Sequence, residues 1–100
     1  MMQTIFGLSL PVSPSLPLAP AFGAALARRM GEAAATLDDA PVAQAARVRR
    51  DAQSYLAAVR AGDLRLSTSA RRACDDAAYT LLRLTADAPP LVAPAERLVA

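Results

Sequence analysis

The sequence contains no histidine, no lysine and no tryptophan, and it has one cysteine and four scattered glycines. Without histidine it cannot form a Ser–His–Asp or Cys–His pair, nor a histidine-ligated metal site. Without lysine it has no P-loop lysine and no Schiff base, and the glycines form no phosphate-binding loop. A single cysteine allows no disulfide within the chain and no structural zinc site. These absences predict a protein that is not an enzyme and uses no metal or cofactor.

Large apolar side chains are also scarce, although 54% of the 100 residues are hydrophobic. Alanine accounts for 25 of these residues and only four are aromatic. Because burial stabilises by roughly 25 cal/mol per Å² of apolar surface, alanine contributes little. A short chain with such a thin core is marginally stable alone. We therefore expect a homo-oligomer or a small subunit of a larger complex.

The net charge is small, and acidic and basic residues are interspersed along the chain. All eleven basic residues are arginine, the nine acids lie among them, and the net charge is +2. No apolar run reaches the roughly 18 residues of a membrane span. Residues 1–27 lack the positive start of a signal peptide and are interrupted by four prolines. The alanine- and arginine-rich composition is typical of a bacterial protein, and we expect it to be cytoplasmic with no membrane contact.

The N-terminal residues 1–20 form a separate segment in this interpretation. Phe6, Leu8 and Leu10 alternate with small or polar residues, which is the pattern of a short strand. Prolines then occur at every third position from 11 to 20, as on one edge of a polyproline II helix. Two readings stay open for this extended, proline-rich arm: an unstructured leader, or an arm that contacts a neighbouring subunit through Phe6, Leu8 and Leu10.

Three amphipathic helices are predicted after the arm, at about 21–37, 41–61 and 68–88, and together they form one helical domain over 21–88. Gly62 suits the left-handed position past a helix end, and a serine or threonine at 67–69 suits the start of the third helix. Short connections favour an antiparallel three-helix bundle of the all-α class. Residues 89–100 form a short tail with room for one helical turn.

Cys74 and the paired acids have structural explanations. Cys74 lies on the apolar stripe of the third helix, so we expect a core residue rather than a reactive thiol. Asp75 and Asp76 point about 100° apart on a helix, so they do not face each other as a catalytic pair would. Ion pairs with Arg71 and Arg72 are the expected arrangement.

Arg47, Arg49 and Arg50 form the densest basic cluster. With an acid directly after them, a solvated helix face is the structural interpretation. The functional alternative is a patch that recognises phosphate groups, and hence nucleic acid.

Tyr79 is the residue that the helical pattern singles out. It lies about 170° from the centre of the apolar stripe of its helix, at 100° per residue. Arg72, Asp76 and Arg83 are its helical neighbours, and Leu82 lies beside it. Either this second strip packs against another helix, or it forms a partner-binding surface, since Tyr and Arg are enriched at interfaces.

Residues 55–84, reading YLAAVRAGDLRLSTSARRACDDAAYTLLRL, resemble the helical hairpin of small HEPN-like bacterial proteins. Members of that superfamily are helical bundles, often dimeric, and many belong to toxin–antitoxin or nucleotidyltransferase-associated systems. Their ribonucleases use an R-x4-x-H motif whose histidine this chain lacks. The resemblance therefore implies a catalytically silent member or a partner subunit.

Two functional hypotheses follow from the sequence. The first is a non-enzymatic protein–protein interaction module that uses Phe6, Leu8 and Leu10 of the arm and the strip around Tyr79. The second is a nucleic-acid-associated regulator or antitoxin that uses its arginine-rich faces.

Overall fold

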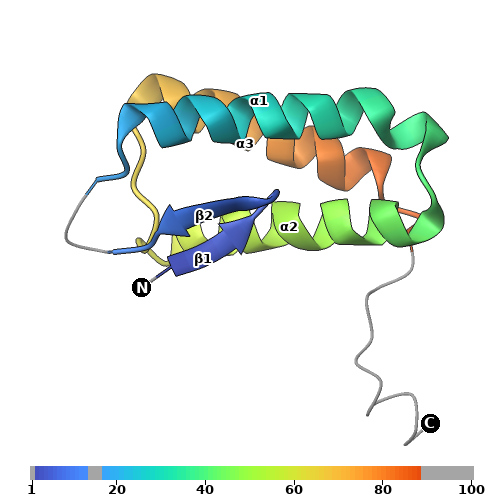
Figure 1. Cartoon of the computed structure of the whole chain (residues 1–100), viewed down its shortest axis with the longest axis horizontal. Helices are drawn as coiled ribbons and strands as arrows, with labels where there is room; N and C mark the ends of the chain where they lie inside the picture. Colours follow the sequence, from blue (N-terminus) through green and yellow to red (C-terminus); the bar gives the residue numbers. More distant parts are fainter. Residues whose placement is uncertain (1, 14–16, 89–100) are drawn as a thin grey trace, which may run out of the picture.

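The computed structural model describes residues 2–13 and 17–88, which form three long helices and a small antiparallel β-hairpin (Figure 1). In chain order the elements are β1 (Met2–Ile5), β2 (Leu8–Pro11), α1 (Pro20–Thr36), the short 3-10 helix η1 (Leu37–Asp39), α2 (Val42–Arg60) and α3 (Thr68–Leu84). The three predicted helices are confirmed, with the largest difference at the end of α3. The predicted tail at 89–100 lies outside the described residues.

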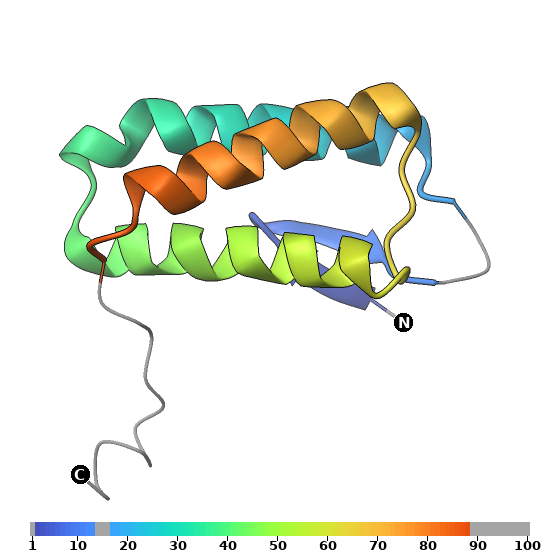
Figure 2. The same ribbon diagram turned by 180° about the vertical axis from the view of Figure 1, so that it is seen from behind.

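The helices do not close into a bundle by themselves. α3 packs against both α1 and α2, whereas α1 and α2 make few direct contacts although they follow each other in the chain. The two opposite views place α3 on one side of this pair and the hairpin on the other (Figures 1 and 2). The hairpin thus takes the place in the core that direct α1–α2 packing would otherwise fill.

The prediction of three helices is therefore confirmed, whereas the all-α class is not, because Met2–Ile5 and Leu8–Pro11 form a two-stranded antiparallel sheet within the segment where the sequence predicts an extended arm. The predicted strand pattern is confirmed in β2, but β2 pairs with β1 in an antiparallel register, Ile5 opposite Leu8 and Gln3 opposite Leu10. Ile5 and Leu10 are fully buried in the same cluster as the core residues of the helices. The chain thus buries these side chains itself instead of offering them to a neighbour.

The alanines on the buried sides of the helices explain why the core needs the hairpin. Among the five buried residues of α2, three are alanines, at positions 46, 52 and 58. Alanine side chains cannot fill the space between two helices at native packing density. Ile5 and Leu10 supply that volume, together with the fully buried Tyr55.

The hairpin turn touches both helices that the core must join. Phe6 and Gly7 have φ angles of 53° and 77°, the pattern of a two-residue type I′ turn. The Phe6 backbone N–H donates a 3.2 Å hydrogen bond to the Asp51 carboxylate on α2. A side chain at Gly7 would lie 3.3 Å from the Arg29 guanidinium on α1. The bond to Asp51 holds Phe6 in a left-handed conformation that non-glycine residues rarely adopt.

The ends of α2 and α3 follow the predicted capping pattern. Gly62 has a φ of 81° directly after α2, and the Ser67 hydroxyl accepts the Ala70 N–H at the start of α3. The linker between these helices is fixed to the residues before α1, because Leu18 N–H donates to the Arg65 carbonyl at 2.7 Å.

Candidate interaction surface

The inner side of α3 belongs to the core. Cys74, Ala78 and Leu81 are fully buried, which confirms Cys74 as a core residue. The Cys74 thiol lies 3.7 Å from the Gly23 carbonyl and donates to it. Burial raises the pKa of this thiol to about 11, with a smaller contribution from the negative charge of Asp75. At neutral pH the group is a protonated, shielded thiol, the opposite of a reactive cysteine.

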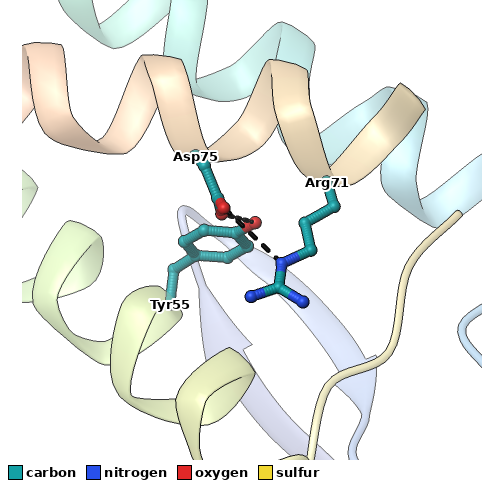
Figure 3. Close-up of polar contacts among 3 residues, drawn as sticks. All are labelled: Tyr55, Arg71 and Asp75. Atoms are coloured by element: carbon teal, nitrogen blue, oxygen red, sulfur yellow. Dashed lines mark hydrogen bonds and ion pairs between the residues drawn. The ribbon is translucent and has the colours of Figure 1, made fainter. Parts of the chain in front are cut away.

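A buried tyrosine fixes α3 to α2. The Tyr55 hydroxyl donates a 2.7 Å hydrogen bond to Asp75 Oδ1, and Arg71 Nε lies 3.5 Å from Asp75 Oδ2 (Figure 3). Burial, and then the bond to Asp75, raises the pKa of Tyr55 far above its usual range. The predicted pairing of Arg71 with Asp75 is thus confirmed. Asp75 holds the fold together, whereas the adjacent Asp76 points into solvent.

The opposite side of α3 presents a mixed polar and aromatic surface, which we call the α3 outer face. It consists of Arg72, Asp76, Tyr79 and Arg83, all exposed, and 56% of Tyr79 is accessible. None of the three charged residues forms an ion pair with another described residue, including the expected pair of Arg72 with Asp76. At 100° per residue the four positions fall within about 60° of one another.

A shallow hollow of about 450 Å³ runs along this side of α3. Its lining residues are Thr68, Arg71, Arg72, Asp75, Asp76 and Tyr79. The hollow brings the exposed Asp76 and Tyr79 next to Arg71 and Asp75, which form an ion pair with each other. A partner side chain that enters it would meet charges of both signs beside an aromatic ring.

The packing interpretation of the strip beside Tyr79 is confirmed for Ala78 and Leu82, and the partner-binding interpretation stays a prediction. Ala78 is fully buried and Leu82 is partly buried against the core, because α3 lies between α1 and α2. Leu82 is therefore used within the chain. Tyr79 and its charged neighbours remain in solvent, so the partner-binding prediction is reduced to the α3 outer face.

The three N-terminal residues that were predicted to bind a partner are also used within the chain. Leu10 is fully buried, and Phe6 and Leu8 are partly buried against the same core. The hairpin encloses these side chains because β2 packs its inward side chains against the helices. Its exposed large hydrophobic residue is Met2, at 61%.

The structure does not bring Arg47, Arg49 and Arg50 onto one surface. The Arg49 guanidinium donates to the carbonyls of Leu82 and Thr85, at 3.0 and 3.3 Å. It thereby binds the C-terminal end of α3, where the helix dipole is negative. Arg49 is half-buried there, while Arg47 and Arg50 are exposed. Of the three arginines in this cluster, Arg47 and Arg50 therefore stay available for a phosphate group. Arg49, the middle one, is engaged within the chain, which weakens the nucleic-acid alternative.

Sequence reasoning missed a second hollow, of about 510 Å³, at the tip of the hairpin. It lies between α1 and α2, and its lining includes Phe6, Arg29, Glu32, Arg47 and Asp51. Burial raises the pKa of Asp51, and the bond from the Phe6 N–H opposes the shift. No local signal could have revealed this site, because it exists only when the hairpin lies across both helices.

Comparison with known proteins gives no relative: no family model, no curated protein and no solved structure matches the chain. The HEPN-like resemblance and the cytoplasmic location therefore stay predictions from the sequence. Within residues 2–13 and 17–88, no helix is long and apolar enough to cross a membrane. The same residues contain no group of three or more acidic or cysteine side chains placed to hold a metal ion.

Proposed function

We propose that this chain is a non-enzymatic protein–protein interaction module that works as a homo-oligomer or as a small subunit of a complex. Its contact surface is the α3 outer face. The observation that carries the proposal is Tyr79, an aromatic side chain that is 56% exposed between charged residues without ion-pair partners in the described chain. Tyrosine and arginine dominate the energetics of known interfaces.

The rigidity of the helix beneath this face supports the proposal. Tyr55 anchors α3 from below through Asp75, and Arg49 covers its C-terminal carbonyls. Tyr79 and its neighbours are therefore held on a fixed helix before any partner arrives. A surface organised in advance loses less conformational entropy on binding, so more of its contact energy appears as affinity.

Replacing Tyr79 by alanine is expected to weaken the association about tenfold or more, because truncating a central aromatic residue costs about 1–2 kcal/mol or more. The fold should be unaffected, since exposed substitutions change stability by about 0.5 kcal/mol or less. Two measurements give the association: sedimentation equilibrium of the pure chain over the micromolar range, and the stoichiometry of complexes recovered after cross-linking in cells.

Val42→Ala is the matched control, because Val42 is a large apolar residue that is 64% exposed on a different helix. The proposal requires Tyr79→Ala to lose the assembly and Val42→Ala to keep it. A wild-type chain that neither self-associates nor forms a stoichiometric complex would contradict the proposal. Equal assembly by both variants and the wild type would contradict it as well.

A further inference from the structure

We propose that the partner of the α3 outer face is a second copy of this chain, docked with the two α3 helices antiparallel about a two-fold axis that passes between Tyr79 and Thr80. This inference rests on the proposed function and names its partner. It is carried by the charge pattern of the face, which is complementary to itself in one register.

The spacing of the face suits helix-to-helix packing. Arg72, Asp76, Tyr79 and Arg83 are separated by four, three and four residues. This is the spacing of the seam of a coiled coil, where alternate steps of four and three keep one line of side chains facing the partner helix. α3 has 17 residues, so the seam continues over most of its length.

The two-fold axis follows from the charges. In a two-fold contact, if residue i of one copy meets residue j of the other, then j also meets i. With the axis between Tyr79 and Thr80, each Asp76 lies opposite Arg83 of the partner copy, and the two Tyr79 rings lie beside the axis. Each Arg72 then lies level with Asp87 of the partner copy, an exposed acid in the turn after α3. Every charge of the face thus acquires an opposite charge.

Neighbouring antiparallel registers do not achieve this match. Centring the axis between positions 77 and 78 places Arg72 opposite Arg83 of the partner copy, so that like charges meet twice. Centring it on position 74 pairs Arg72 with Asp76 but leaves Arg83 level with Arg65 of the partner copy, an exposed arginine just before α3, so like charges meet there as well. Like-charge contacts across an interface are costly and select against a register.

The test is a charge exchange between two variants of the full chain, Asp76→Arg and Arg83→Asp. Each variant alone places like charges opposite each other at two symmetric positions, so its self-association should weaken about tenfold or more. Mixed in equal amounts, the two variants place opposite charges at both positions. The mixture should therefore form a heterodimer with a dissociation constant within about threefold of the wild-type value. Sedimentation equilibrium measures all three samples.

Three outcomes would overturn the proposal: a wild-type chain that stays monomeric over the micromolar range, an Arg83→Asp variant that associates like the wild type, or a mixture that recovers no association. The proposed function is tested separately from the dimer. It stands if the wild type forms a stoichiometric cross-linked complex that Tyr79→Ala loses, even when the partner is another protein. If circular dichroism shows that a reversal variant is unfolded, Asp76→Asn and Arg83→Gln replace the pair. Each should then weaken the dimer about threefold, and full wild-type association by both would overturn the proposal.

Discussion

Replacing Leu10 by alanine is expected to lower the free energy of unfolding by about 2–5 kcal/mol, the usual cost of truncating a fully buried leucine. Leu10 lies in the N-terminal hairpin yet has no exposed surface, and it packs in one cluster with the helix residues Leu26, Met30 and Leu81. Because alanine-rich helices leave the core thin, a loss of this size is a large part of the total stability. Urea denaturation followed by circular dichroism measures it.

Met2→Ala is the control for this experiment, because Met2 is a large residue of the same hairpin with 61% of its surface exposed. It should change the free energy of unfolding by about 0.5 kcal/mol or less. If Leu10→Ala and Met2→Ala had the same small effect, the N-terminal segment would be dispensable for the fold. The hairpin would then not be the element that fills the core between α1 and α2.

Raising the pH from 9 to 11 is expected to destabilise the chain by about 3 kcal/mol in total, because each titrating group contributes at most about 1.4 kcal/mol per pH unit. Two buried side chains that ionise at high pH, the Cys74 thiol and the Tyr55 hydroxyl, cause the loss. The pKa of Cys74 is raised from 9.0 to about 11 by burial, and burial together with the Asp75 contact raises the pKa of Tyr55 above its ordinary 10.0. Above those ordinary values the unfolded chain loses protons that the folded chain keeps.

The sign of this effect follows from proton binding. Both groups are neutral in the fold, so their contribution is fully present below pH 9, declines from pH 9 for Cys74, and declines from pH 10 for Tyr55. Denaturant titrations at closely spaced pH values measure the slope. Cys74→Ala should remove the loss that begins at pH 9, and Tyr55→Phe the loss that begins at pH 10. A free energy of unfolding that stays constant up to pH 11 would contradict the burial of both groups.

The helices could be predicted because their signals are local. Apolar residues recur at the helical period, and Gly62 and Ser67 mark two of the ends. The hairpin could be predicted only in part. The alternation of β2 is visible in the sequence, but β1 has four residues and the turn has phenylalanine where asparagine or aspartate is usual. Its bond to Asp51, which is 45 residues away, holds that turn and leaves no local trace.

For the candidate site as well, the sequence predicts the features set by helical periodicity but not those that depend on contacts between helices. The outward position of Tyr79 follows from 100° per residue, so the sequence predicts it directly. The role of Arg49 does not follow, because it depends on where the C-terminal end of α3 meets α2. The difference between Asp75 and Asp76 is also tertiary, since only the approach of Tyr55 makes one acid structural and leaves the other in solvent.

Nitration of tyrosine as a function of protein concentration tests the central claim most directly, because the chain has two tyrosines with opposite environments. Tyr55 is fully buried with its hydroxyl bonded to Asp75, and Tyr79 is 56% exposed at the proposed two-fold axis. With tetranitromethane near pH 8, Tyr55 should stay unmodified throughout. Tyr79 should react in dilute solution and become protected as the concentration passes the dissociation constant, but not in Asp76→Arg. A rate of Tyr79 nitration that is independent of concentration in the wild type would contradict the claim that a second copy covers the α3 outer face.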